Sequence, residues 1–404
     1  MNSKNKNSRN SVYKTIMTIV ATAIITFVIT TVWIYSRAGA ESAESAIGSA
    51  AKSRALAAKL SIIRNKIDSE YVGEVNEDDL IDGAVKGYVS GLNDVYSEYL
   101  TEEEMSSYTE DIEGEFVGIG VYITKDTTNN LIVVYGTIPN SPAQAAGLKT
   151  GDIITSVDGV QCDGYDYDSI TNSIRGLEGT KVTLGILRGE EELTFEIERK
   201  TVEVEHVTSQ VLEDNIGYIY ISSFEGNVAD QFKKAYNDLS SQGITSLIID
   251  VRNNGGGIVD ESLEIAELMT DKGQTLLIEL DKNGDEKVIK AEEDKTITMP
   301  IVLLVNEYSA SASEILAGIM KENVENAILI GDTTYGKGVI QTLYSLTDGS
   351  GLKITTNEYF TPNHNTINKI GIEPDIKVDD YLYTGTLDLE NDTQLQKAIE
   401  ELKK

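Results

Sequence analysis

The chain has 404 residues, 40% of them hydrophobic, which is enough to bury a sizeable core spread over two or three domains. Its formal net charge of -32, from 34 basic and 66 acidic residues, excludes a broad basic surface for nucleic-acid backbone or anionic lipid. Cys162 is the only cysteine, so an intrachain disulfide is excluded as well.

The N-terminus has the pattern of a membrane anchor. Residues 1–15 form a short basic tail, and residues 16–35 are an almost uncharged apolar run of 20 residues. At about 1.5 Å per residue, this run matches a hydrocarbon core of about 30 Å. Positive charges gather before it, so we expect a cytoplasmic N-terminus and an extracytoplasmic remainder at the cell membrane.

A cleaved signal peptide is the alternative to this anchor. Ala38-Gly39-Ala40 has the small residues of a processing site. The apolar run is longer than the usual signal core of about 7 to 15 residues, and Arg37 interrupts its end. We therefore expect an uncleaved single-pass helix.

Two segments follow before the pattern of the chain changes. Residues 36–59 are rich in alanine, serine and charged residues, and we predict a spacer there. Over residues 60–112, apolar positions such as Ile62, Ile63 and Ile67 recur at helical spacing. A small N-terminal helical segment is expected.

Residues 113–200 are predicted to form a compact β domain. Glycine turns separate short β-rich runs at Phe116–Ile123, Leu131–Tyr135, Ile153–Val157, Lys181–Arg188 and Leu193–Glu198. Gly118-Ile119-Gly120 and the later stretch Ser141–Ile154 together resemble a PDZ domain. A PDZ-like groove takes a peptide as an added strand, and backbone N–H groups around Gly118, Ile119 and Gly120 would receive its terminal carboxylate. Taken alone, these glycines would indicate only a turn.

Residues 201–382 alternate apolar strands with helices. The predicted elements are strands at Gly217–Ile221, Ser246–Val251, Thr275–Leu280, Ile301–Val305 and Ala327–Ile330, helices at Val228–Ser240, Asp260–Met269 and Ser313–Lys321, and a β-rich stretch at Val339–Phe360. An Asn283-Gly284 hairpin signal interrupts the series. The alternation indicates an α/β domain with a largely parallel sheet covered on both faces. Residues 383–404 are expected to end in a short amphipathic helix.

Two loops of this domain carry the chemistry. Residues 252–257, R-N-N-G-G-G, follow one apolar strand, and residues 309–314, S-A-S-A-S-E, follow another. In parallel sheets, ligands and reactive groups collect at the carboxyl ends of strands. A triple glycine there lets backbone N–H groups point into a site, as an oxyanion hole needs, although by itself it would indicate a tight turn.

The second loop supplies a hydroxyl nucleophile, and a lysine downstream supplies a base. Ser311 and Glu314 also fit a capping box, and a serine at a helix start lies in the positive end of the helix dipole. Lys337 lies between two glycines ahead of a β-type run, and to act as a base its pKa must fall by about 3 units through burial. Gln341 projects to the same face of that strand and could orient the amine.

Residues 331–337 also match the phosphate-binding pattern G-x-x-x-x-G-K. Gly338 stands where this pattern needs serine or threonine for magnesium, and a β-type run follows instead of a helix. Nucleotide binding is therefore disfavoured, and no metal or cofactor is expected.

The order of anchor, helical segment, PDZ-like domain, R-N-N-G-G-G, S-A-S-A-S-E and G-K-G-x-x-Q resembles the carboxyl-terminal processing peptidases, also called tail-specific proteases. The resemblance covers about residues 60–380. It implies a crotonase-like catalytic core and a PDZ domain that recruits C-terminal tails and can gate the site. It also implies these roles: Ser311 as nucleophile, Lys337 as general base, Gln341 as its orienting partner, and Gly257 with Ala312 as oxyanion donors.

Two departures from the family pattern are visible. Gly255 replaces the usual proline and should loosen its loop, and the connection at 321–326 is one residue longer than usual.

Three functions follow from these patterns. The first is a membrane-tethered, exported serine endopeptidase that acts on protein substrates with free C-terminal tails. The second is a PDZ-type binding scaffold with an inactive peptidase domain. The third, a Ser-His-Asp protease, is poorly supplied, because the only histidines are His206 and His364, both downstream of the PDZ-like part. The terminal helices are compatible with a homodimer.

Overall fold

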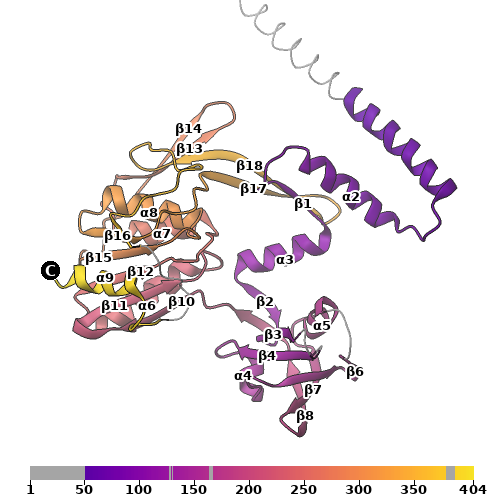
Figure 1. Ribbon diagram of the computed structural model, residues 1–404, viewed down its shortest axis with the longest axis horizontal. Helices are drawn as coiled ribbons and strands as arrows, with labels where there is room; N and C mark the ends of the chain where they lie inside the picture. Colours follow the sequence, from indigo (N-terminus) through magenta and orange to yellow (C-terminus); the bar gives the residue numbers. More distant parts are fainter. Residues whose placement is uncertain (1–50, 127–128, 130, 163–166, 379–386) are drawn as a thin grey trace, which may run out of the picture. The chain divides into compact units, whose positions relative to one another are not determined.

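The computed structural model describes residues 51–126, 129, 131–162, 167–378 and 387–404 (Figure 1). The predicted cytoplasmic tail and anchor, at 1–15 and 16–35, lie outside these ranges. None of the helices in the described ranges combines the length and apolarity needed to span a bilayer. The chain divides into two compact units, Met1–Leu80 and Ile81–Lys404.

The first unit contains a helix at residues 51–70. Its exposed faces carry ion pairs one turn apart, from Arg64 to Asp68 and from Lys66 to Glu70. Such pairs support a helix at the surface. The predicted helical character of this region is confirmed, and the helix begins earlier than residue 60.

The helix α2 (Glu77–Ser90) crosses the boundary between the units, and the second unit continues with β1 (Glu98–Leu100) and α3 (Glu102–Glu113). Thr101 and Glu104 form a capping box that fixes the start of α3. Gly114 ends the helix in the left-handed conformation, with φ of 65°. The short strand β1 was not predicted.

The PDZ-like part is a β domain with its own apolar core. Its main sheet has the order β3 (Val121–Asp126), β4 (Leu131–Thr137), β5 (Ile153–Val157), β7 (Lys181–Arg188) and β8 (Glu191–Glu198), with β6 (Val160–Gln161) on β5. A separate pair joins β2 (Glu115–Gly118) to β9 (Lys200–Glu203), and two helices, α4 (Pro142–Ala146) and α5 (Tyr167–Ile174), complete the domain. The predicted run Phe116–Ile123 breaks into two strands because Gly120, with φ of 72°, turns the backbone.

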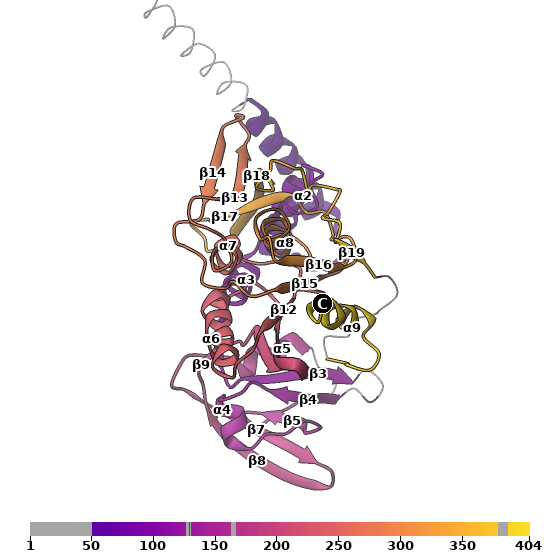
Figure 2. The same ribbon diagram turned by 90° about the vertical axis from the view of Figure 1, so that its left-hand side faces the viewer.

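The α/β domain predicted at residues 201–382 is built on a six-stranded sheet (Figures 1 and 2). Its order is β10 (Val207–Val211), β11 (Ile216–Ile221), β12 (Ser246–Asp250), β15 (Ile301–Val305), β16 (Ala327–Gly331) and β19 (Ile376–Lys377), with a 3-10 turn at Glu213–Asn215. All neighbours pair in parallel except β10 with β11. The prediction of a largely parallel sheet is confirmed here.

Alternate residues of these strands point to opposite faces, and helices cover both. One face packs against α6 (Val228–Ser241), α7 (Val259–Glu267) and α8 (Ala312–Asn323). On the other face, Leu395 and Ala398 of α9 (Thr393–Leu402) pack against Tyr218, Ile248 and Val302. The two-faced burial explains why the strands are apolar without alternation.

A second, antiparallel sheet corrects the sequence prediction. Its strands are β1, β18 (Gly351–Phe360), β13 (Thr275–Asp281) and β14 (Glu286–Lys290), with β17 (Val339–Ser345) also paired to β18. The strand at 275–280 was expected to continue the parallel series, but β13 pairs with β14 and β18 instead. The Asn283-Gly284 turn, where Gly284 has φ of 85°, reverses the chain at this point.

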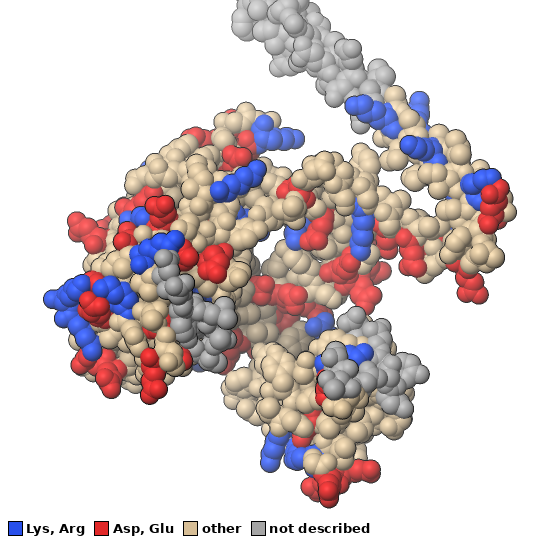
Figure 3. Space-filling model, in the orientation of Figure 1, with Lys and Arg blue, Asp and Glu red and all other residues tan. Residues whose placement is uncertain are grey.

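Charged side chains are interspersed over the face of the molecule that Figure 3 shows. On that face, acidic groups lie among the basic ones and no broad basic surface forms. The view agrees with the exclusion drawn from the net charge.

Candidate active site

The two predicted loops meet at the carboxyl ends of the neighbouring strands β12 and β15. The hydroxyl of Ser309 donates to the Val251 carbonyl at 2.8 Å, and the hydroxyl of Ser313 donates to the Asn254 carbonyl at 2.9 Å. The Ala310 amide donates to that same Asn254 carbonyl at 3.0 Å. Ser309 and Ser313 thus hold the serine loop against residues 251–254, whereas the hydroxyl of Ser311, the middle serine, takes no part in this contact.

Ser311 is the residue immediately before α8, and its backbone is unusual. Its φ of 55° and ψ of -115° are rare for a residue with a side chain and indicate local strain. Such strain is found at functional sites where the surrounding structure over-determines the backbone. The helix start adds the positive end of the α8 dipole beside the hydroxyl.

Two glycines allow the glycine loop to approach this serine. A side chain on Gly256 would meet the Ser311 Cβ at 2.7 Å, and one on Gly257 would meet the Phe224 backbone at 2.5 Å. Both have positive φ, 107° and 143°. Within the described part of the chain, the amides of Gly257 and Ala312 donate no hydrogen bond. These are the two predicted oxyanion donors.

Lys337 approaches from the start of β17, as predicted. A side chain on Gly338 would come within 2.5 Å of the Asn368 amide, so glycine is needed there for close packing. The lysine is half-buried, and burial lowers the pKa of its amine, with the positive charge of Lys353 lowering it further. Glu314 and Asp94 act in the opposite direction on the same pKa.

The Lys337 amine lies over the Tyr96 ring, 4.8 Å from the ring centroid. Among the described residues, no hydrogen bond joins this amine to the Ser311 hydroxyl. The Gln341 amide does not orient the lysine here either, since it donates to Thr355 Oγ1 at 3.2 Å. The predicted roles of Lys337 and Gln341 remain predictions.

The buried carboxylate of Glu314, which was predicted only to cap a helix, connects the serine loop to the segment 334–337. Glu314 Oε2 accepts from the Ser311 amide at 3.0 Å and from the Lys337 amide at 2.8 Å. Its Oε1 accepts from Thr334 Oγ1 at 2.7 Å and from the Gly336 amide at 2.6 Å. Burial raises the pKa of Glu314, and these donors oppose the rise. Glu314 thus fixes the Ser311 backbone against the Lys337 backbone.

Tyr359 makes a second bridge between Ser311 and Lys337. Its hydroxyl donates to the Ser311 carbonyl at 3.2 Å and to the Lys337 carbonyl. The ring is buried, at 1% exposure. Its only sequence signal is its place in a β-rich run.

The glycine loop, Ser311 and Lys337 border a cleft of about 630 Å³, which Gln341 also lines, whereas the buried Ala312 does not line it. Its lining includes Ser311, Lys337, Gln341, Gly255, Gly256, Gly257, Ile258, Val339, Ile340, Leu343, Tyr108, Ile112, Asp111, Glu225 and Lys353. Charged and polar side chains such as Asp111, Glu225 and Lys353 line the cleft together with apolar ones such as Ile258 and Leu343.

A second groove, of about 330 Å³, lies in the PDZ-like domain. It runs along β3, which is an edge strand of its sheet, and is bordered by α5 and by Gly118, Ile119 and Gly120. An open strand edge of this kind can accept a peptide as a further strand. Arg175, which no sequence motif marks, lines the same groove, pairs with Glu110 at 2.7 Å and lies over the Phe116 ring.

The alternatives considered from the sequence find little support. Neither His206 nor His364 lines the cleft; burial lowers the pKa of His206, and His364 lies 2.9 Å from Glu286. Residues 339–345 after Lys337 form strand β17, as the sequence predicts, and not the helix that a phosphate loop needs. In the ranges that the structure describes, there is no cluster of three or more potential metal ligands.

The fold and the site define a serine peptidase that carries a PDZ domain. The model of peptidase family S41 matches residues 215–378, that of a PDZ domain matches residues 133–188, and that of the CtpB activating protease N-terminal domain matches residues 19–104. The chain is 38% identical over 333 residues to the carboxy-terminal processing protease CtpA of Bacillus subtilis (strain 168), covering 82% of this chain and 71% of that protein. The chain belongs to the carboxy-terminal processing proteases of family S41.

Two further proteins are similar over most of this chain. A CtpA-like serine protease of Staphylococcus haemolyticus (strain JCSC1435) is 37% identical over 323 residues, which are 79% of this chain and 64% of that protein. A crystal structure from Bacteroides fragilis, assigned as an S41 protease, has a TM-score of 0.51 at 16% identity, covering 83% of this chain and 91% of the other. That last likeness concerns the fold alone.

Proposed function

We propose that this serine peptidase is a membrane-anchored, extracytoplasmic endopeptidase that cuts near protein C-termini with a Ser311–Lys337 dyad. One observation carries the proposal. The strained Ser311 and the half-buried Lys337 border one cleft, and a single carboxylate, Glu314, binds the backbone amides of both. Two reactive groups held by a common buried anchor have the preorganisation that catalysis requires.

The chemistry follows from the groups at hand. The Ser311 oxygen attacks the substrate carbonyl carbon while its proton passes to the neutral Lys337 amine. The oxygen that becomes negative accepts from the Gly257 and Ala312 amides. Lys337 then gives the proton to the leaving amine, and an acyl ester remains on Ser311. Water, deprotonated by the same lysine, hydrolyses that ester and frees the serine.

Forming the dyad requires a rearrangement of side chains. The Lys337 amine must leave the Tyr96 ring and turn toward Ser311, and Gln341 must release Thr355 to hold it. Hydrogen bonds at catalytic residues commonly tighten only when substrate is bound. The lowered pKa of Lys337 supports its role, because only the neutral amine can accept the serine proton.

The PDZ-like groove is proposed to recruit the free C-terminal tail of a protein substrate. The tail would pair with the edge of β3 and place its carboxylate at Gly118, Ile119 and Gly120, with Arg175 as a nearby cation. Arg175 is engaged by Glu110 of α3, so a bound carboxylate would compete with that ion pair. We propose that the domain gates the cleft in this way, because Glu110 belongs to α3, whose residues Asp111 and Ile112 line the cleft.

Three further assignments belong to the proposal. The catalytic core is crotonase-like, in keeping with the family resemblance and the parallel sheet. The apolar run at 16–35 anchors the chain, and its charge asymmetry orients it. The exposed apolar side chains of the helices between residues 51 and 92 would suit a homodimer contact.

Cleavage of a tail peptide tests the function. The full-length chain should cut a quenched fluorescent peptide with a free, apolar C-terminus, and the same peptide ending in a carboxamide should be cut at least about 10-fold less efficiently. Ser311→Ala and Lys337→Ala should each lower kcat by about 10³-fold or more without loss of fold. If the chain binds the peptide but never cuts it, the protein is a binding scaffold instead. Activity that survives Ser311→Ala would refute the dyad.

A further inference from the structure

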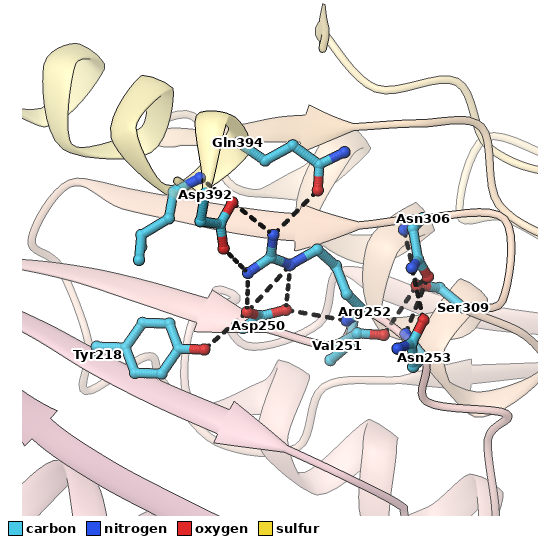
Figure 4. Close-up of polar contacts among 10 residues, drawn as sticks. Tyr218, Asp250, Val251, Arg252, Asn253, Asn306, Ser309, Asp392 and Gln394 are labelled. Carbon is cyan, nitrogen blue, oxygen red and sulfur yellow. Dashed lines mark hydrogen bonds and ion pairs between the residues drawn. The ribbon is translucent and has the colours of Figure 1, made fainter. Parts of the chain in front are cut away.

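Arg252, the first residue of the glycine loop, is fully buried although it is charged, and every one of its N–H groups is used. Its Nε donates to Asp250 at 2.9 Å, and its two terminal nitrogens donate to Asp250, Asp392 and Gln394 at 2.6 to 3.0 Å (Figure 4). An arginine has five such donors. The guanidinium is therefore held in one position.

Two of these partners come from the far end of the chain. Asp392 is the residue before α9, and its carboxylate also accepts from the Leu395 amide at 2.9 Å, which caps the helix. Gln394 lies in the first turn of α9 and donates to the Val378 carbonyl at 3.0 Å. The cluster thus ties α9, on one face of the sheet, to the loop at the edge of the same sheet.

The cluster contains two carboxylates and one guanidinium, all fully buried or nearly so. Its excess negative charge is offset by the Tyr218 hydroxyl, which donates to Asp250 at 2.7 Å, and by the positive end of the α9 dipole beside Asp392. Buried ion pairs of this kind add little net stability, because desolvation of the charges cancels most of their attraction. Stability alone therefore does not explain why this charged cluster is buried here.

The cluster lies at the start of the glycine loop. The Arg252 amide donates to Asp250 at 3.0 Å, which sets the turn out of β12. Beyond it, the Asn253 amide donates to Asn306 at 2.9 Å, and Asn254 Oδ1 accepts from the Gly256 amide at 2.9 Å. Arg252 is anchored from the α9 side. Asn253 is anchored by the serine loop, Asn254 by the Ile221 carbonyl and Gly256 by the Phe224 amide.

We propose that Asp392 and Gln394 are positioning residues for catalysis: through the Arg252 side chain they hold the glycine loop so that the Gly257 amide meets the developing oxyanion. This inference rests on the proposed function. Neither residue touches substrate. Their effect is on the placement of one donor, where misplacement by about 1 Å can cost about 100-fold in rate.

The test uses the full-length chain and measures kcat and KM separately on the free-tail peptide. Asp392→Asn keeps a good helix cap but removes one charge from the Arg252 site, and Gln394→Met keeps the volume but removes an acceptor. We expect kcat to fall about 10-fold for Asp392→Asn and about 3-fold for Gln394→Met, with KM within about 2-fold of wild type. Asp388→Asn is the matched control, because Asp388 precedes the same helix and, among the described residues, its carboxylate accepts only from Glu390 and Asn391; the carbonyl that accepts from the Asp392 amide is unchanged by this substitution.

The pH profile separates this role from a general loss of structure. Because the cluster acts on the oxyanion side, the acid limb of kcat/KM, which reports Lys337, should stay where it is in wild type. Wild-type kcat in both folded variants would overturn the inference, as would a defect confined to KM or an activity loss that only tracks the folded fraction. Undiminished cleavage by Ser311→Ala would instead remove the proposed function, and the inference with it.

Discussion

Glu314 is the residue on which the geometry of the two reactive groups depends most. Four donors converge on its carboxylate, two of them the backbone amides of Ser311 and Lys337. A glutamine at this position could accept at one atom only, and its amide hydrogens would face other donors. The same carboxylate lies close enough to Lys337 to oppose the fall of its pKa.

Glu314→Gln should therefore weaken both structure and catalysis. We expect a loss of about 2 kcal/mol in the free energy of unfolding and a fall of about 10- to 100-fold in kcat. Denaturant unfolding and steady-state kinetics measure the two effects. Glu307→Gln, an exposed glutamate of the same loop, serves as the control. Wild-type kcat in a stably folded Glu314→Gln variant would contradict the role.

Lys353 governs a second property of the site, the pKa of Lys337. Only neutral Lys337 can act as a base, so activity should be lost as the pH falls through its pKa. Lys353→Met removes a positive charge that lowers this pKa. The pKa should rise, and the acid limb of the kcat/KM profile should move to higher pH. Lys287→Met, an exposed lysine of the second sheet, should leave the limb in place; a shift to lower pH for Lys353→Met would refute the assignment.

At the scale of elements, two neighbouring glycines of the glycine loop differ in the space around them and in their backbone conformation. Gly256 has φ of 107° and faces the Ser311 Cβ, whereas Gly255 has open space around the position of a Cβ and an ordinary φ. Gly256→Ala should lower kcat by about 100-fold or more, because the loop must move away from the nucleophile. Gly255→Ala should keep kcat within about 2-fold and raise stability by about 0.5 kcal/mol by restricting the unfolded chain. Kinetics and thermal unfolding of the pair check both statements, and equal effects would contradict them.

Much of the element order was predictable from local sequence. The parallel strands are uniformly apolar, as in Ile301–Val305, and the structure places β15 at the same residues. The antiparallel sheet was not predicted, because whether β13 joins β15 or β18 depends on contacts far along the chain.

The candidate site divides in the same way. Ser311, Lys337 and the glycines carry recognisable motifs, and all of them reach one cleft. No motif marks Tyr359 or the pairing of Arg252 with Asp392. Arg252 and Asp392 are 140 positions apart in sequence, so no local pattern could indicate that they meet. Glu314 was visible only as a helix cap, because its other three partners come from a different loop.

At the scale of the whole molecule, the proposed anchor at residues 16–35 would hold the peptidase at the membrane. The full-length chain should remain with the membrane fraction after an alkaline wash, and a chain lacking residues 16–35 should not. The N-terminal residue of the mature protein separates the two hypotheses. An N-terminus near residue 41 would show a cleaved signal peptide and contradict the anchor.

The central claim is that Ser311 is made nucleophilic by neutral Lys337. Labelling with a fluorophosphonate, followed by peptide mass spectrometry, tests it most directly because the label records the serine that reacts. We predict that the label lies on Ser311, that its rate rises with pH along the titration of Lys337, and that Lys337→Ala abolishes it. Label on another serine, or labelling of Ser311 at an undiminished rate in Lys337→Ala, would contradict the claim.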